Sequence, residues 1–158
     1  MHDTEEVNID GVVLTGLAQI VDERGAVLHM IRADSNDFMG FGECYFSEVL
    51  PGKIKAWKLH KRHTQNLVVP VGTVRIVLYD VREHSKTHGV LREILLGRPK
   101  AYYRLTIPPG IWYGFACVGK SPALLANCTD FPHDKSESEA CPLDDTRIPF
   151  SWQMDASV

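Results

Sequence analysis

The stretch from Gly52 to Gly72 reads GKIKAWKLHKRHTQNLVVPVG. Two glycines bracket a strand-like first half, a cluster of histidines and basic residues, and an apolar second half. Similar short apolar runs recur along the chain, separated by turn residues such as Pro51-Gly52 and Pro108-Pro109-Gly110. Regularly spaced short runs without a 3.6-residue periodicity predict an all-β sandwich or barrel.

The other expected strands lie near residues 11–21, 26–31, 44–50, 73–81, 92–97, 102–108 and 123–129. In the run at 73–81, one face is purely apolar, with Val74, Ile76 and Leu78. The opposite face is mixed, because it carries Arg75 and Tyr79 beside an apolar residue. We expect one side of this sheet to pack on a core and the other to line a cavity or an interface.

The length of 158 residues predicts one domain over 1–158, large enough to bury a substantial core. Within it we expect an N-terminal strand arm at 1–25 and a short C-terminal tail at 130–158. The tail is polar but ends in a small apolar patch of Ile148, Phe150 and Trp152. This pattern indicates a segment folded back over a barrel.

The charge balance excludes some classes of partner. A formal net charge of −3 argues against a dedicated nucleic-acid binder, which needs an excess basic face. The local basic cluster from Lys53 to Arg62 suggests a small anionic ligand, with a solvated charged edge as the alternative. The acidic start, the lack of a long apolar run and four scattered cysteines predict a reduced, cytoplasmic setting without membrane insertion.

The spacing inside the opening stretch matches the metal-binding pattern of the double-stranded β-helix, or cupin, fold. That pattern places its ligands at positions occupied here by Lys58, His60 and Gln65, and a later Pro-x-Gly-x-x-His element ends here in Tyr113. Lysine, glutamine and tyrosine are poor replacements for histidine and glutamate, so we predict no metal site. His63 has the opposite strand parity to His60. A metal-dependent cupin that uses His60, His63 and an unrecognised acid remains the alternative.

Several motifs occur together in order and spacing. They are DERG at 22–25, GKIKAWK at 52–58, D-x-R-x-x-S-x-T-x-G at 80–89, IPPGIWYGF at 107–115, and Asp145 seven residues before Trp152. With these motifs the chain resembles the dTDP-4-dehydrorhamnose 3,5-epimerase family of metal-free cupins. The resemblance implies a jelly-roll barrel, a homodimer with exchanged N-terminal strands, no cofactor, and a cavity for a nucleoside-diphosphate 4-keto-6-deoxy sugar.

The resemblance also implies catalytic roles, with some exchanges of residue type. Lys58 occupies the position of the family's catalytic histidine, and Asp145 that of the aspartate which orients it. His60 shares a strand face with Lys58 and is expected to be the base, while Lys58 stabilises an enolate or acts as base itself. The family's acid tyrosine falls on Ala126, and Tyr113 is a phenol that enters from another wall.

The expected substrate contacts come from several segments. Arg24 in the DERG turn fits a phosphate-binding arginine, and Lys55 keeps the charge of a strand arginine. Asn66 falls on the family's enolate lysine, and His63 and His29 complete the expected binding residues. Lys55 and Lys58 differ by three positions, so both enter one cavity only through a β-bulge.

The sequence therefore predicts an isomerase that epimerises a nucleotide sugar by removing a proton next to its 4-keto group. The alternative is a catalytically degenerate cupin that binds a nucleotide sugar without turnover, suggested by Lys58 and Ala126.

Overall fold

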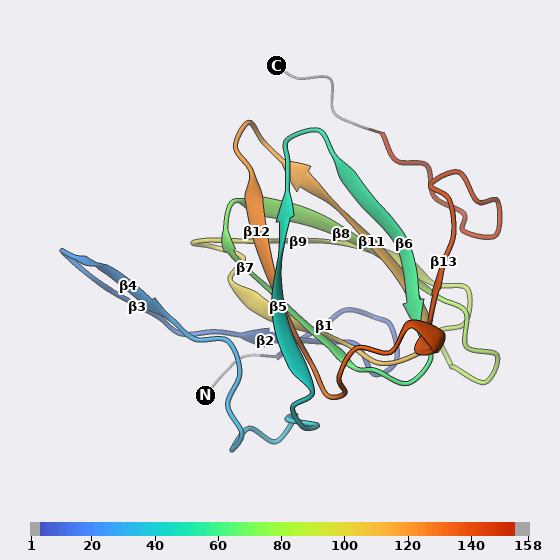
Figure 1. Ribbon diagram of the computed structural model, residues 1–158, viewed down its shortest axis with the longest axis horizontal. Helices are drawn as coiled ribbons and strands as arrows, with labels where there is room; N and C mark the ends of the chain where they lie inside the picture. The colour runs from blue at the N-terminus through green and yellow to red at the C-terminus, as the bar shows by residue number, and fades with distance from the viewer. Residues whose placement is uncertain (1–3, 154–158) are drawn as a thin grey trace.

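The structure is a computed structural model that describes residues 4–153 (Figure 1). Within this part of the chain the regular elements are β-strands and one short 3-10 helix, η1 (Lys135–Glu137). The strands are β1 (Thr4–Glu6), β2 (Val13–Gly16), β3 (Gln19–Asp22), β4 (Gly25–Leu28), β5 (Glu43–Val49), β6 (Ile54–His60), β7 (Gln65–Val71), β8 (Thr73–Asp80), β9 (Leu91–Gly97), β10 (Tyr103–Ile107), β11 (Ile111–Val118), β12 (Ala123–Thr129) and β13 (Ser138–Ala140). No helix in the described range is long and apolar enough to span a bilayer.

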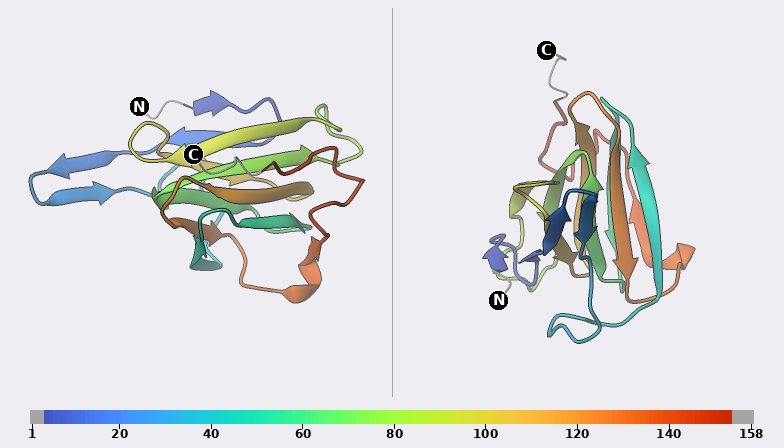
Figure 2. Two further views of the ribbon diagram at one scale, coloured as in Figure 1. Left: turned by 90° about the horizontal axis from the view of Figure 1, so that it is seen from above. Right: turned by 90° about the vertical axis from the view of Figure 1, so that its left-hand side faces the viewer.

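Two antiparallel sheets form the two walls of a barrel (Figures 1 and 2). One sheet has the strand order β1-β2-β10-β7-β12-β5, and the other has β13-β6-β11-β8-β9. Strands distant in sequence, such as β2 and β10, therefore lie side by side, as in a jelly roll. The predicted all-β cupin fold is confirmed.

Strand β8 shows how residue alternation divides the interior from the outer face. Val74, Ile76 and Leu78 are completely buried and belong to the core between the two sheets. Val77 faces the other way and packs in a second apolar cluster with Trp57 and Trp112. The tail residues Ile148, Phe150 and Trp152 cover that cluster from outside. The mixed face of β8 is thus buried under the C-terminal segment.

The hairpin of β3 and β4 projects away from the barrel (Figures 1 and 2). Its tip is the turn between Asp22 and Gly25, which pair directly across the two strands. Ile20, Val21 and Val27 are apolar but between 59% and 66% exposed. The hairpin therefore carries exposed apolar side chains outside the barrel.

Strand β6 contains a β-bulge opposite Gly114. Tyr113 of β11 pairs with Lys58, whereas Phe115, two residues later, pairs with Lys55, three residues earlier. The backbones approach closely here, since a Cβ added to Gly114 would lie 2.3 Å from the Cβ of Ala56. Only glycine leaves room for that approach. The bulge changes the strand parity between Lys55 and Lys58.

Candidate functional site

A cavity of about 310 Å³ opens between the two sheets. Most of its lining residues come from β5, β6, β11 and β12, and the full set is Tyr45, Ser47, Lys55, Ala56, Trp57, Lys58, Leu67, Tyr113, Phe115, Leu125, Asn127 and Ala140. Among the ionisable lining groups are two lysines and two tyrosines, with no carboxylate in this set. A concave, partly apolar site with positive charge suits an anionic ligand that carries a ring.

The β-bulge brings Lys55 and Lys58 into the same cavity. The sequence predicts that both lysines can enter one cavity only if the strand contains such a bulge. The ammonium of Lys55 donates a 2.7 Å hydrogen bond to the hydroxyl of Ser47 on the facing sheet. Lys58 on β6 is the direct cross-strand neighbour of Tyr113 on β11. The site therefore has one lysine paired with Tyr113 and a second lysine three residues earlier on β6, paired with Phe115.

Behind Tyr113 lies a buried hydrogen-bonded chain of side chains. The hydroxyl of Tyr113 is 3.2 Å from Nε2 of His60, and Nδ1 of His60 makes a short hydrogen bond with Oε1 of Glu137. The three residues are between 3% and 7% exposed. They come from β11, from the end of β6 and from η1, so segments far apart in sequence build this chain. Tyr113 lines the cavity, and His60 reaches the cavity through it.

Local structure fixes the carboxylate of Glu137. Asp134 caps η1 by accepting a hydrogen bond from the amide of Ser136, which starts the turn that directs Glu137 inward. Oε2 of Glu137 then accepts from the backbone amides of Lys61, Arg62 and His63, at 3.2 to 3.4 Å. Burial raises the pKa of Glu137, but its hydrogen bond to His60 and the nearby amides outweigh this and lower the pKa overall. Glu137 is therefore an ionised acceptor.

The protonation of His60 follows from this arrangement. Burial lowers the pKa of His60, and the opposing effect of Glu137 only partly restores it. A neutral imidazole has one N–H, which Nδ1 must carry because an ionised carboxylate only accepts. Nε2 then accepts from the hydroxyl of Tyr113. Burial strongly raises the pKa of Tyr113, with a smaller contribution from Tyr45, so the phenol keeps its proton in the resting site.

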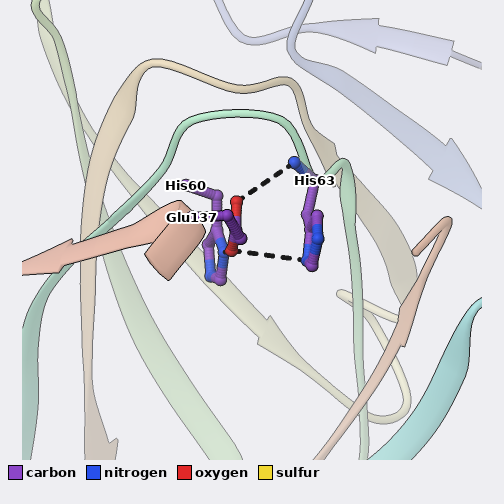
Figure 3. Close-up of side chains that lie close together, drawn as sticks. All are labelled: His60, His63 and Glu137. Carbon is purple, nitrogen blue, oxygen red and sulfur yellow. Dashed lines mark hydrogen bonds and ion pairs between the residues drawn. The ribbon is translucent and has the colours of Figure 1, made fainter. Parts of the chain in front are cut away.

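His63 also reaches this cluster, which corrects the parity argument. Strand β6 ends at His60, so His63 lies in the following turn and its Nδ1 comes within 3.3 Å of Oε1 of Glu137 (Figure 3). The rings of His60 and His63 are nearly parallel, at 12°, with centroids 5.8 Å apart. One nitrogen of each ring and one oxygen of Glu137 lie within 4.8 Å of one another, which is close enough for the three residues to hold one metal ion, while Oε2 of Glu137 is held by three amides. Both Nδ1 atoms are turned to Glu137 in a hydrogen-bonded cluster, and Glu137 is the acid that a metal site with His60 and His63 would use, so the metal-dependent alternative stays open.

Two predicted residues lie outside the cavity lining. Asp145 accepts three hydrogen bonds from the amide and guanidinium of Arg147, at 2.8 to 3.0 Å, which lower the pKa of its carboxyl. Glu137, in place of Asp145, is the carboxylate that contacts His60. Arg24 is 82% exposed at the hairpin tip and pairs with Asp22. A catalytic role for Asp145 and a substrate-binding role for Arg24 stay predictions.

Three further positions are not in the cavity lining. Asn66 bonds to the carbonyl of Cys128 and accepts from Thr106, while its neighbour Leu67 lines the cavity. His29 lies just after β4 and contributes its backbone to contacts with Ala18 and Tyr102. Ala126 alternates with the lining residues Leu125 and Asn127. A tyrosine at Ala126 on this backbone would point out of the cavity.

Sequence reasoning missed three residues that the structure brings to the site. They are Glu137, Tyr45 and Asn127. Glu137 lies 77 residues from His60 in a polar segment without strand periodicity. Tyr45 and Asn127 are opposite each other on neighbouring strands, and only knowledge of the register between β5 and β12 connects them.

Comparisons with known proteins match the chain to one enzyme family over nearly its whole length. The family model for dTDP-4-dehydrorhamnose 3,5-epimerase matches residues 6–158. The chain is 32% identical over 149 residues to the spore coat polysaccharide biosynthesis protein SpsL of Bacillus subtilis, covering 93% of this chain and 98% of SpsL. It is 31% identical over 152 residues to the probable low-salt glycan biosynthesis epimerase Agl13 of Haloferax volcanii, covering 94% of this chain and 97% of Agl13.

Among solved structures, the chain is similar to a dTDP sugar isomerase from Desulfovibrio desulfuricans G20. The two share 56% sequence identity and superpose with a TM-score of 0.89, covering 91% of this chain and 92% of the other. At this identity the likeness extends well beyond the fold of the barrel.

Proposed function

The chain belongs to the dTDP-4-dehydrorhamnose 3,5-epimerase family and is a sugar-nucleotide epimerase, and from this premise we propose that it inverts a carbon next to the 4-keto group of a nucleoside-diphosphate 4-keto-6-deoxy sugar. The nucleotide we propose is dTDP, because the relative of 56% identity is a dTDP sugar isomerase. The observation that carries the proposed chemistry is the chain of hydrogen bonds from Glu137 through His60 to Tyr113, at the cavity wall beside Lys58.

The proposed reaction begins with removal of a proton from carbon 3 or 5, which the neighbouring ketone acidifies. The oxygen of Tyr113 takes this proton while its own proton moves to Nε2 of His60. The electron pair of the broken C–H bond forms the double bond of an enolate, and the ammonium of Lys58 stabilises the negative oxygen. The carboxylate of Glu137 compensates the imidazolium that forms on His60.

The substrate's phosphates need cations as well. Lys55 supplies one within the cavity of the same chain. The β3–β4 hairpin, whose turn contains Arg24, projects away from the barrel and carries exposed apolar residues (Figure 1). We therefore propose a homodimer in which the β3–β4 hairpin reaches the second copy and brings Arg24 to the phosphates there. The four unpaired cysteines support the predicted cytoplasmic setting.

A binding protein without turnover is the less favoured alternative. A relative of 31% identity that matches nearly the whole chain is named as a probable epimerase. The cavity also holds a phenol with a base behind it, which binding alone does not require.

Deuterium exchange tests the proposal. The protein is incubated with dTDP-4-keto-6-deoxyglucose in deuterated water, and mass spectrometry and NMR follow exchange at carbons 3 and 5. We expect exchange with the wild type and a loss on the order of 10²–10⁴-fold in Tyr113→Phe. Tyr79→Phe, which alters a phenol in the outer apolar cluster, is the matched control and should keep the wild-type rate.

Two results would contradict the proposal. The absence of exchange and of inversion with dTDP-, GDP- and CDP-linked 4-keto-6-deoxyhexoses would remove the epimerase function. Wild-type exchange in Tyr113→Phe together with its loss in Lys58→Met would identify Lys58 as the base.

A further inference from the structure

Inversion of a carbon centre requires proton transfer at both faces of the sugar ring. The Tyr113–His60 pair and Lys58 all stand on the sheet that contains β6 and β11. A group that delivers a proton to the opposite ring face must come from the facing wall, formed by β5, β7 and β12. Ala126 does not supply it, because it has no proton to give and its strand neighbours take the cavity face.

The facing wall contributes Tyr45, Ser47, Leu67, Leu125 and Asn127 to the cavity. The two leucines carry no exchangeable proton. The aliphatic hydroxyl of Ser47, which accepts a hydrogen bond from the ammonium of Lys55, is a much weaker acid than a phenol, and an amide such as Asn127 is not a proton donor to carbon. Tyr45 is therefore the remaining acid on this wall, and it lies on β5, in the sheet that faces the sheet of Tyr113.

The contacts of Tyr45 prepare it to donate. Nδ2 of Asn127 donates a 2.9 Å hydrogen bond to the phenol oxygen of Tyr45 and a 2.6 Å bond to Oε1 of Gln65. Asn127 is 1% exposed and therefore fixed, and it pairs with Tyr45 directly across the two strands. Because Asn127 occupies a lone pair of the phenol oxygen, the O–H of Tyr45 remains available for the cavity. A donor to this oxygen also stabilises the phenolate left after the proton is given.

We propose that Tyr45 is the general acid of the epimerisation, delivering a proton to the ring face opposite to Tyr113. This rests on the proposed function. In this step the enolate double bond supplies the electron pair of the new C–H bond, and the 4-keto group re-forms. The O–H bond of Tyr45 breaks, its phenolate is held by Asn127, and a proton from solvent restores the phenol. Burial raises the pKa of Tyr45, so the phenol is protonated when the enolate forms.

Separating exchange from inversion tests Tyr45. Wild type, Tyr45→Phe, Tyr113→Phe and the control Tyr79→Phe are incubated with dTDP-4-keto-6-deoxyglucose in deuterated water. NMR then measures deuterium at carbons 3 and 5 in the original and in the inverted configuration. For Tyr45→Phe we expect inversion to fall on the order of 10²–10⁴-fold, while deuterium still enters with retention of configuration within a few-fold of the wild-type rate. Tyr113→Phe should lose both.

Two outcomes would overturn the assignment of Tyr45. One is inversion at the wild-type rate in Tyr45→Phe. The other is an equal loss of inversion and exchange in a variant whose thermal unfolding matches the wild type, which would make Tyr45 a substrate-binding residue. Asn127→Leu is a second variant of similar volume, and it should lower inversion more than exchange.

The same experiment separates this proposal from the proposed function. If wild type neither exchanges nor inverts any nucleotide sugar, the epimerase proposal itself fails. If wild type inverts the substrate and Tyr45→Phe inverts it equally well, only the role of Tyr45 fails.

Discussion

Glu137 connects the protonation of the site to the folding of the C-terminal segment. One oxygen contacts His60, and the other accepts three backbone amides of the turn after β6. Replacing the ionised carboxylate by an amide leaves a buried donor facing these amides. We expect Glu137→Gln to destabilise the fold by about 1–3 kcal/mol in chemical denaturation. Glu139→Gln changes a half-exposed neighbour that forms an ion pair with Lys61, and it should change stability by less than about 0.5 kcal/mol.

The same variant should change the pH dependence of catalysis. The carboxylate raises the pKa of His60 against the larger lowering effect of burial, so removing its charge lowers the pKa of His60 further. The acidic limb of the exchange rate plotted against pH should therefore move to lower pH in Glu137→Gln. An acidic limb that moves to higher pH would show that Glu137 does not act through His60.

Burial of His60 also makes stability depend on pH. Its folded-state pKa lies below the unfolded value near 6.5, so between these two values the unfolded chain binds more protons. The contribution of neutral His60 to the free energy of unfolding is complete above about pH 6.5 and decreases as the pH falls toward the folded-state pKa of His60. Thermal unfolding from pH 8 to 5 should show a smaller loss in His60→Gln than in the wild type. His84→Gln, at an exposed position, should follow the wild type.

At the scale of elements, the β-bulge in β6 decides which side chains meet. A regular strand would direct Lys55 and Lys58 to opposite faces, and the bulge opposite Gly114 brings both into the cavity. Gly114→Ala places a Cβ against Ala56 and should destabilise the protein by about 1–3 kcal/mol while lowering exchange.

The rescue variant distinguishes crowding from other effects. Ala56→Gly combined with Gly114→Ala removes the shortest contact and leaves the new Cβ 3.0 Å from Trp152 and 3.1 Å from the Cα of residue 56, so thermal unfolding should return part of the way to the wild type. A double variant that is less stable than both single variants would rule out the contact with Ala56 as the cause.

The sequence predicts most of the barrel strands because alternation and turn residues are local signals, but β11, which pairs with both β6 and β8, was not among the expected strands. It also predicts that Lys55 and Lys58 need a bulge to share a cavity, but the location of the bulge depends on Gly114 in another strand. The contact of Glu137 with His60 was not predictable, since η1 has no periodicity and its position depends on β13 pairing with β6. The pairing of Tyr45 with Asn127 was not predictable either, because it depends on the register between β5 and β12.

At the scale of the whole molecule, the projecting hairpin predicts a dimer with shared sites. Ile20 and Val27 pair on one face of the hairpin and are both exposed. Ile20→Glu combined with Val27→Glu should convert a dimer to a monomer in light scattering coupled to gel filtration. Leu95→Glu, an exposed apolar position on β9, is the control and should leave the dimer intact. A monomeric wild type would contradict the proposal.

Mixing two inactive variants tests whether Arg24 acts in the second copy. Arg24→Ala and Tyr113→Phe carry their defects in different parts of the proposed composite site. After unfolding and refolding together, random pairing leaves about a quarter of the sites intact, so activity should return to about that fraction. If each cavity uses its own Arg24, the mixture stays inactive.

The late position of Glu137 in the chain has a consequence for protein synthesis. Every strand of the barrel from β1 to β12 precedes η1 and β13, and β13 pairs along the free edge of β6. On the ribosome, a nascent chain emerges from its N-terminus and folds as its parts become available. The barrel strands β1 to β12 are therefore translated before the carboxylate behind His60, so the hydrogen-bonded chain behind Tyr113 is completed only after these strands.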